Sequence, residues 1–278
     1  MKSAALAARL RRIRHVALDM DGTLYSGSRL FDGTKPFLAL LTKLGIGWTF
    51  LTNNSSKSVA DYVLHLQGMG IAARPGDFFT STQATIQCLR ESLPAVRKLF
   101  VLGTVSMRRE LAAAGYRMTA DRANDEPDAV IAGFDTALTF SRLCRAAWWI
   151  KSGKPYIASH PDSVCPTSEP TVLVDCGAVC AALHTATGRW PDMIPGKPNA
   201  RMLHGLRQRL GLKPDELAMV GDRLYTDILM ARRAKALGVL VLTGEATAEE
   251  ASKSKMPPDL VVTDAGEFGR LLRMSQKP

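Results

Sequence analysis

Two carboxylates one residue apart, Asp19 and Asp21, directly follow the short apolar run Val16–Leu18. Such a run is typical of a strand that is buried on both faces. Carboxylates at the end of a buried strand lose hydration energy unless a cation or a proton pairs them. The pattern therefore predicts a metal site at the strand end, and an Asp-rich turn without chemistry is the alternative interpretation.

A second polar group follows the next predicted strand, and it consists of Thr52, Asn53, Asn54, Ser55 and Ser56. Their hydroxyls, amides and backbone N–H groups precede a predicted helix, and a helix N-terminus favours anions. This arrangement predicts a phosphate-binding loop. An ordinary helix cap formed by one of the two serines is the alternative, but it explains only one of these residues.

Two further strand ends complete a set of groups that fits phosphate chemistry. Lys197 lies in a Gly-Lys-Pro sequence, and Asp222 and Asp227 follow a predicted strand over residues 216–220. An aspartate can attack phosphorus and form an acyl phosphate. Attack on an anionic phosphate requires positive charge, which Mg²⁺ and a lysine supply, and Mg²⁺ prefers carboxylates such as those of Asp19 and Asp222. A second carboxyl group, held protonated, can protonate the leaving oxygen.

The elements that would position these groups alternate between strand and helix along the chain. We expect strands over residues 16–18, 46–51, 98–102, 129–133, 155–158, 216–220, 239–242 and 260–262. We expect helices over residues 36–44, 58–69, 82–92, 106–114, 141–152, 177–187, 200–210, 228–236 and 265–274. Residues 24–35 and 160–170 should form loops, and residues 249–258 a connection on the surface. The alternation predicts an α/β fold with a parallel sheet, in which ligands bind beyond the carboxyl ends of the strands. The middle of the chain repeats the alternation, which predicts a second, smaller sheet.

Composition limits the choice of partners. The chain has 278 residues, 46% of them hydrophobic, and this length predicts a large core and two domains. The formal net charge of +10 favours an anionic partner. However, the basic residues are scattered, and neither a zinc-finger spacing nor an RNA-binding signature occurs. We therefore expect a small phosphorylated metabolite as the partner, and no nucleic acid.

Cysteine usage and the N-terminal segment favour a cytoplasmic protein. The five cysteines include no Cys-x-x-Cys pair, so we expect reduced, mostly buried thiols. Residues 1–14 lack the apolar core of a secretory signal and predict a short leading helix. Because no run approaches the ~20 apolar residues of a membrane span, we expect no association with a membrane.

The four polar groups, in this order and at this spacing, resemble the motifs of the haloacid dehalogenase-like phosphohydrolases. Residues 19–23 resemble the first motif, Thr52 in Leu-Thr-Asn-Asn the second, and Lys197 in Gly-Lys-Pro the third. The sequence Gly-Asp-x₄-Asp that ends at Asp227 resembles the fourth. The forms of the second and third motifs are similar to those of the type IIA branch, which includes NagD-like and p-nitrophenyl phosphatases.

This resemblance implies a two-domain architecture. The family has a Rossmann-like parallel-sheet core, which would correspond here to residues 1–79 and 188–278. An α/β cap that selects the substrate would be inserted over residues 80–187.

The resemblance also implies a role for each core residue. Asp19 would be the nucleophile and a Mg²⁺ ligand. Asp21 would protonate the leaving alcohol and then activate water, and its backbone carbonyl would also bind the metal. Asp222 would ligate Mg²⁺, and Asp227 would hold that ligand or Lys197 in place.

The implied substrate contacts lie in two regions. Thr52, the Asn53 amide and the neighbouring Asn54 would hold the phosphate group together with Lys197. In the cap, we expect substrate contacts from two stretches, His160-Pro161-Asp162 and Asp175-Cys176-Gly177-Ala178, and above all from Asp162, Asp175, Cys176 and Gly177. Only the second stretch resembles a turn that faces the phosphate in the family. For each of the two cap stretches, a purely structural loop is the alternative interpretation.

Together these groups predict a Mg²⁺-dependent phosphatase that hydrolyses sugar, polyol or aryl phosphates through an aspartyl-phosphate intermediate. A non-catalytic protein that binds phosphorylated metabolites is one alternative, but such a protein has no need of Asp21. A phosphotransferase or phosphomutase on the same fold is the other, and it would admit an alcohol in place of water. The pair Trp148-Trp149 on a predicted cap helix indicates core packing or a homodimer contact through the cap.

Overall fold

The structure is a computed structural model that describes residues 2–165, 167 and 170–276. Its contacts divide the chain into two compact units. Unit 1 comprises Met1–Leu51, Val63–Phe79 and Lys197–Pro278, and unit 2 comprises Thr52–Tyr62 and Thr80–Gly196. The sequence-based boundaries placed residues 52–62 and 188–196 in the core, whereas the contacts group both stretches with the inserted segment.

Residues 188–196 group with unit 2 because they run back along its sheet. Met193 forms a β-bridge with Ile157. The Ala158 N–H donates to the Met193 carbonyl at 3.0 Å, and the Asp192 N–H donates to the Tyr156 carbonyl at 2.7 Å. The sequence-based boundary was placed at Thr187, where the helix ends. The contacts with the sheet of unit 2 continue beyond it, as far as Gly196.

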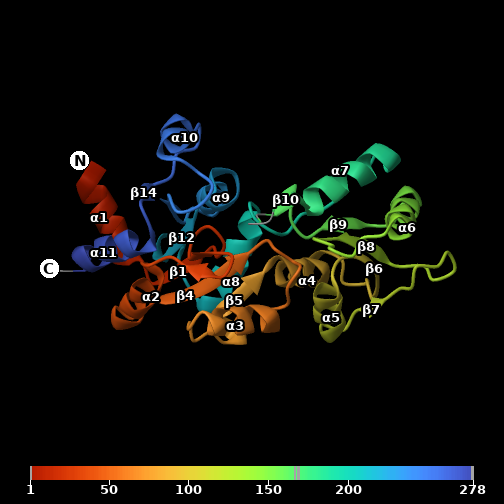
Figure 1. Cartoon of the computed structure of the whole chain (residues 1–278), viewed down its shortest axis with the longest axis horizontal. Helices are drawn as coiled ribbons and strands as arrows, with labels where there is room; N and C mark the ends of the chain where they lie inside the picture. Colours follow the sequence, from red (N-terminus) through yellow and green to blue (C-terminus); the bar gives the residue numbers. More distant parts are fainter. Residues whose placement is uncertain (1, 166, 168–169, 277–278) are drawn as a thin grey trace. The chain divides into compact units, whose positions relative to one another are not determined.

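Within the described residues, unit 1 is built on a six-stranded sheet with the order β14-β13-β12-β1-β4-β5. Figure 1 labels all of these strands except β13. Its strands are β1 (His15–Leu18), β4 (Gly47–Thr52), β5 (Phe78–Thr80), β12 (Leu217–Gly221), β13 (Leu237–Val241) and β14 (Leu260–Val262). The helices of this part of the chain are α1 (Lys2–Arg12), α2 (Thr34–Lys43), α3 (Val59–Gly68), α8 (Ala200–Leu210), α9 (Leu229–Ala234), α10 (Ala248–Lys253) and α11 (Ala265–Ser275). The pairs β14-β13, β13-β12, β12-β1 and β1-β4 are parallel.

The sheet places two of the predicted strand ends side by side. Strand β1 lies between β12 and β4, and its register aligns Leu18 with Val220. All four residues of β1 are buried, as its apolar run predicted. Because parallel neighbours end at the same edge of a sheet, Asp19 leaves β1 close to the level at which Asp222 leaves β12.

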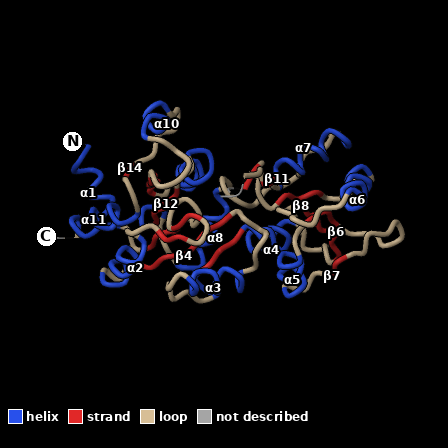
Figure 2. Tube along the Cα trace, viewed as in Figure 1, coloured by secondary structure: helices blue, strands red, loops and turns tan. Residues whose placement is uncertain are grey.

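Unit 2 contains a second sheet, with the order β7-β6-β8-β9 among the described residues. Figure 2 labels its strands β6, β7 and β8. Its parallel strands are β6 (Lys98–Leu102), β7 (Arg117–Met118), β8 (Ala129–Ala132) and β9 (Tyr156–Ala158). Its helices are α4 (Ser81–Ser92), α5 (Val105–Ala113), α6 (Phe140–Lys151) and α7 (Cys176–Thr187).

Helices cover both faces of the second sheet. Phe100 of β6 belongs to one hydrophobic cluster with Trp149 of α6. Its neighbour Leu99 belongs to another, with Leu89 of α4 and Leu111 of α5. Successive side chains of a strand point to opposite faces, and a sheet buried on both faces reads as a continuous apolar run. The α/β fold with a Rossmann-like core and a second α/β region is thus confirmed.

Several short strands were not predicted from the sequence. The loop predicted over residues 24–35 contains a hairpin, and the loop predicted over 160–170 contains one strand of a two-stranded ribbon. These strands are β2 (Tyr25–Ser26), β3 (Arg29–Leu30), β10 (Val164–Cys165) and β11 (Leu173–Val174). Residues 166, 168 and 169 of the second predicted loop lie outside the described residues.

The predicted surface connection over residues 249–258 contains helix α10. The Thr247 hydroxyl accepts from the Glu250 N–H, and the Glu250 carboxylate accepts from the Thr247 N–H, which is a capping box. Because this helix has only six residues, its charged pattern has no clear apolar face. None of the helices in the described part of the chain has both the length and the apolar character needed to cross a lipid bilayer.

Candidate active site

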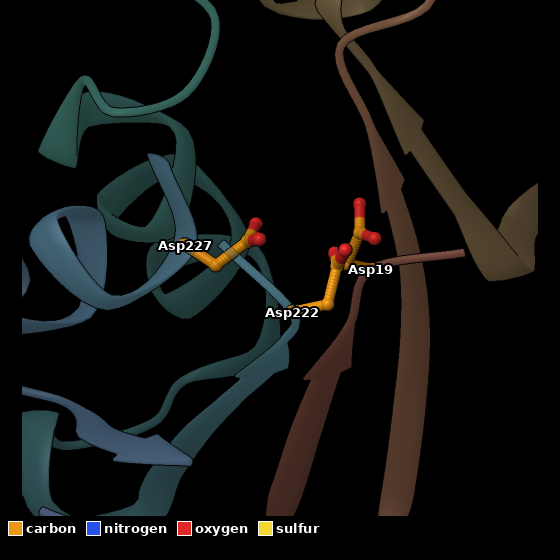
Figure 3. Close-up of side chains that lie close together, drawn as sticks. All are labelled: Asp19, Asp222 and Asp227. Atoms are coloured by element: carbon orange, nitrogen blue, oxygen red, sulfur yellow. The ribbon is translucent and has the colours of Figure 1, made fainter. Parts of the chain in front are cut away.

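Three aspartates converge at the carboxyl edge of the sheet of unit 1. Asp19 follows β1, Asp222 follows β12, and Asp227 lies in the π-helical turn η3 (Leu224–Ile228). All three residues are buried, and one carboxylate oxygen from each lies within 4.8 Å of the others. Figure 3 shows the carboxylates of Asp19 and Asp222 close together, with that of Asp227 turned toward them.

A buried lysine links two of these carboxylates. The Lys197 Nζ donates to Oδ1 of Asp19 and, at 2.8 Å, to Oδ1 of Asp227. Burial alone would lower the pKa of Lys197, but the two carboxylates outweigh it and raise the pKa above its ordinary value. The lysine is therefore a fixed cation, only 3% exposed, beside the predicted nucleophile.

The cluster holds more negative than positive charge. Burial raises the pKa of Asp222 to about 7, and the carboxylates of Asp19 and Asp227 add to the shift. Burial also raises the pKa of Asp227 to about 6, although the Lys197 ammonium opposes this shift. Three carboxylates thus share one ammonium group, which leaves the cluster short of a cation.

Asp222 supplies the most direct sign of a metal position. Its Oδ1 atom is buried and has no hydrogen-bond partner among the described residues. A buried carboxylate oxygen without a partner is costly, and oxygen ligands of this kind are those that Mg²⁺ prefers. The donor set of Asp19 and Asp222 therefore fits a hard divalent cation.

A loop that sequence reasoning missed, Thr243–Ala246, wraps the Asp222 side chain and backbone. The Glu245 N–H donates to Asp222 Oδ2 at 2.8 Å, and the Ala246 N–H donates to the Asp222 carbonyl at 3.1 Å. The Thr243 hydroxyl donates to the Gly22 carbonyl at 2.7 Å, which ties the same loop to the turn after β1. A Thr-Gly pair at the end of the apolar run that contains β13 (Leu237–Val241) is the signal that could have found this loop.

Gly244 is required for this close packing, which gives a first prediction. A Cβ atom at Gly244 would lie 2.0 Å from Asp222 Oδ2, closer than any real contact. We expect Gly244→Ala to displace the Asp222 carboxylate and to weaken Mg²⁺ binding at least tenfold, measured by the Mg²⁺-induced rise in melting temperature. The matched control is Gly68→Ala, where the added Cβ has nothing within 4 Å. Equal Mg²⁺ responses in both variants would contradict a positioning role for Gly244.

Asp227 is held by its own turn. A Cβ at Gly221 would lie 2.3 Å from its Cγ, so the glycine lets the carboxylate approach the end of β12. The Arg223 N–H donates to Asp227 Oδ2 at 3.3 Å. The π-helical turn, a form often found at functional sites, thus turns Asp227 toward Lys197.

Asp21 differs from Asp19 in its surroundings. Asp19 is buried and accepts from the Thr23 hydroxyl at 3.1 Å. Asp21 is exposed, in a tight turn where it forms a β-bridge with Tyr25 and where Gly22 takes a φ of +82°. The two carboxyl groups therefore have different surroundings, since Asp19 is mostly buried and Asp21 is exposed to solvent.

The predicted phosphate loop belongs to unit 2 in the contact grouping. The Thr52 hydroxyl accepts from the Asn54 N–H at 3.1 Å, and Asn54 Oδ1 accepts from the Ser56 N–H at 2.9 Å. The Asn53 side chain donates to the Asp162 carboxylate. The structure thus brings Asn53 together with Asp162, both of them predicted site residues.

Of the remaining predicted cap residues, Asp175 and Cys176 are buried and Gly177 is partly buried. Asp175 caps helix α7 by accepting from the Cys176 N–H, and it also bonds the His160 ring. A Cβ at Gly177 would lie 2.2 Å from the Pro161 carbonyl, so a glycine is needed for the close approach of two backbone segments. These contacts give the three residues a structural role, and their contact with substrate stays a prediction.

Comparison with known proteins identifies the family. A model described as haloacid dehalogenase-like hydrolase matches residues 16–117, and one described as HAD-hydrolase-like matches residues 194–268. Mouse chronophin is 33% identical over 90% of this chain and 88% of its own length, and acid sugar phosphatase from Staphylococcus aureus is 31% identical over 93% and 97%. The chain belongs to the haloacid dehalogenase-like hydrolases.

Solved structures agree with this assignment. The 4-nitrophenylphosphatase from Thermotoga maritima matches 94% of this chain and 98% of its own, with a TM-score of 0.88 and 37% identity. Glycerol phosphate phosphatase from Mycobacterium tuberculosis, in complex with magnesium, matches 95% and 78%, with a TM-score of 0.85 and 31% identity. The predicted resemblance and the prediction of a phosphatase-type hydrolase are confirmed.

Proposed function

We propose that this protein is a Mg²⁺-dependent phosphatase that hydrolyses small phosphomonoesters through an aspartyl-phosphate intermediate. The observation that carries the proposal is the buried Asp19 carboxylate, fixed on one oxygen by Lys197 and adjacent to the unpartnered oxygen of Asp222. Such a constellation suits a nucleophile that must approach an anionic phosphate. The names of the relatives, which act on sugar, glycerol and nitrophenyl phosphates, support the same class of substrate.

The proposed mechanism assigns the first step to Asp19. Lys197 donates to Oδ1 of Asp19 and the Thr23 hydroxyl donates to Oδ2, which together fix the carboxylate. One of the two carboxylate oxygens attacks phosphorus, displaces the leaving alcohol and forms the acyl phosphate. Asp21 donates a proton to the leaving alcohol oxygen. Asp21 then accepts a proton from the water that attacks the phosphorus, and this step returns Asp19 as a carboxylate.

The other residues of the site would bind Mg²⁺ or the phosphate group of the substrate. Asp19, Asp222 and the Asp21 carbonyl would hold Mg²⁺, which when bound offsets the charge of the phosphate. For Thr52, Asn53 and Asn54 the proposed role is to bind the phosphate group. Unit 2 would be the cap that selects the substrate, and a homodimer through the cap stays a prediction, with Trp148 57% exposed and Trp149 buried.

Asp21 separates the phosphatase from a non-catalytic binder, which gives a second prediction. We expect Asp21→Asn to slow hydrolysis of alkyl phosphates by about 10²- to 10⁴-fold, because an alkoxide leaves poorly without a proton. The loss should be smaller for an aryl phosphate, whose leaving group needs less help. Rates of phosphate release from the two ester types check this, and an equal loss for both would contradict the acid role.

The pKa of Asp222 predicts how Mg²⁺ binding depends on pH. Its folded-state pKa of about 7 lies above the ordinary carboxyl value, so the stability that this group contributes is present at low pH and is lost as pH rises through about 7. Mg²⁺ requires the carboxylate form. We therefore expect the Mg²⁺-induced rise in melting temperature to be larger at pH 8 than at pH 6.

Melting curves with and without chelator check this third prediction. Asp222→Asn is the control, because it lacks the titrating group and should lose the Mg²⁺ response at both pH values. An equal Mg²⁺ response of the unaltered protein at pH 6 and pH 8 would contradict the assignment of Asp222 as a ligand.

The test of the proposed function is phosphate release from an aryl phosphate, with Mg²⁺ and with chelator. Mg²⁺-dependent release would support the proposal, and a panel of sugar and polyol phosphates would then define the substrate. Adding a free alcohol distinguishes hydrolysis from phosphotransfer, because a transferase would form a new phosphate ester. No release from any ester by a folded, Mg²⁺-loaded protein would favour the non-catalytic alternative.

A further inference from the structure

One loop of unit 2, Ser159–Asp162, contacts segments next to two of the motifs. The Ser159 carbonyl accepts from the Gly196 N–H at 2.9 Å, and Gly196 directly precedes Lys197. The Asp162 carboxylate accepts from the Asn53 amide nitrogen at 3.1 and 3.3 Å. The loop therefore touches both the segment that leads to the lysine and the predicted phosphate loop.

The loop is itself fixed by a buried polar chain. The Ser159 hydroxyl bonds His160 Nδ1 at 2.8 Å, and His160 Nε2 bonds Asp175 Oδ1 at 2.9 Å. The Ser159 hydroxyl also lies 3.5 Å from the Ser55 hydroxyl of the phosphate loop. Ser55, Ser159 and His160 are fully buried. Burial would lower the pKa of His160, but the hydrogen bond to Asp175 and the negative charges around the ring, those of Asp175 and Asp162 among them, outweigh it and raise the pKa.

The backbone of Asp162 is held by the start of helix α7. The Gly177 N–H donates to the Asp162 carbonyl at 2.8 Å. Only a glycine fits at 177, because a Cβ there would collide with the Pro161 carbonyl. The N-terminus of helix α7 therefore fixes the backbone of Asp162, and through it the position of the carboxylate that accepts from Asn53.

The hydrogen bonds to Asp162 fix the orientation of the Asn53 side-chain amide. An ionised carboxylate only accepts hydrogen bonds, so it must face the NH₂ end of an asparagine amide. Asn53 Oδ1 is then directed to the other side, where a Cβ at Gly196 would come within 2.8 Å of it. A neutral or absent partner at 162 would leave both orientations of the amide open.

We propose that Asp162 is a positioning residue that acts through Asn53, by fixing the amide of the phosphate loop, and not through contact with the substrate. This inference rests on the proposed function, because it assigns Asn53 to phosphate binding. It gives the inserted unit a second task besides selecting the substrate. Its Ser159–Asp162 loop keeps the predicted phosphate loop of the same unit in one conformation.

A double-mutant cycle distinguishes the two roles. We expect Asp162→Ala to lower kcat/KM by about 10- to 100-fold, the loss typical of a hydrogen bond to a charged group. Asn53→Ala should lower it similarly, and the double variant should lose little more than either single variant. Because Asn53 would contact only the phosphate, the loss should be the same for aryl and polyol phosphates. Asp162→Asn, which keeps an acceptor oxygen, should recover part of the activity.

Multiplicative losses, or losses that change with the leaving group, would overturn the proposal in favour of direct substrate contact. The matched control is Asp128→Ala, which removes another carboxylate of unit 2 that accepts two backbone N–H groups and has no proposed part in the reaction. Its kcat/KM should equal that of the unaltered protein. A fall as large as that of Asp162→Ala would mean that general destabilisation explains both.

A readout that needs no activity separates this inference from the proposed function. With ¹⁵N-labelled asparagine, the Asn53 side-chain amide signal is assigned by its absence in Asn53→Ala. In Asp162→Ala that signal should shift and its protons should exchange faster with water, whereas Asp128→Ala should leave it unchanged. An unaltered signal in Asp162→Ala would overturn the inference even if the protein is a phosphatase. Failure of the unaltered protein to release phosphate would instead count against the proposed function.

Discussion

Replacing Asp19 with asparagine is expected to abolish phosphate release, with a fall in kcat on the order of 10⁴-fold or more. The amide has the shape of the carboxylate but is a far weaker nucleophile, so no acyl phosphate can form. Phosphate release from an aryl phosphate, at saturating Mg²⁺, measures the loss. Residual turnover above the level of the metal-free protein would contradict the assignment of Asp19 as nucleophile.

The same variant should fold normally, which separates chemistry from stability. Removing the Asp19 charge leaves Lys197 paired with Asp227 and reduces the repulsion that Asp222 experiences. Without Mg²⁺, the variant should therefore melt at or above the temperature of the unaltered protein. Asp259→Asn is the matched control, because Asp259 pairs with Arg9 outside the cluster and its replacement should leave turnover unchanged.

The positions of Asp19 and Asp222 could be predicted because both residues follow the end of a strand. The apolar runs before Asp19 and Asp222 identify two buried strands, and parallel pairing brings the ends of such strands to one edge. The resemblance to a family added the roles of the individual residues. The structure adds the pairing of Lys197 with Asp19 and Asp227, which no spacing in the sequence shows.

What could not be predicted depends on contacts between distant segments. The loop Thr243–Ala246 lies about twenty residues beyond Asp222, and its backbone N–H groups make the contacts with Asp222. The Thr-Gly pair can therefore mark the loop in the sequence, but not its partner. The contact between Asn53 and Asp162 joins positions 109 residues apart. Likewise, residues 188–196 belong to unit 2 through strand-like pairing with β9, although the helix that precedes them had already ended.

Small residues beside polar ones were the least informative signal. The stretch Asp175-Cys176-Gly177 was predicted to face the substrate, with a structural loop as the alternative, and its contact with substrate stays a prediction. In the structure, Asp175 caps a helix, Cys176 is buried in the core of unit 2, and Gly177 allows two backbone segments to meet. Helix caps, core cysteines and close glycines have the same composition as a substrate loop, so composition alone cannot distinguish them.

Lys197→Met is expected to lower both activity and stability. Methionine fills much of the same volume but leaves the carboxylates of Asp19 and Asp227 without a cation. Breaking a buried ion pair by removing one partner costs about 3–5 kcal/mol of unfolding free energy. We expect a loss of this size at pH 8 in the absence of Mg²⁺, measured by denaturant unfolding.

The dependence of this loss on pH tests its cause. Without Lys197, which opposes the upward shift, the folded-state pKa of Asp227 should rise above its present value of about 6. The protonated carboxyl groups are then stable without a cation, so the variant should approach the stability of the unaltered protein as pH falls toward 5 and lose it again as pH rises. Lys43→Met, which alters an exposed lysine at the end of helix α2, is the control and should show no such pH dependence. A deficit that stays constant between pH 5 and pH 8 would mean that lost packing, and not unpaired charge, destabilises the variant.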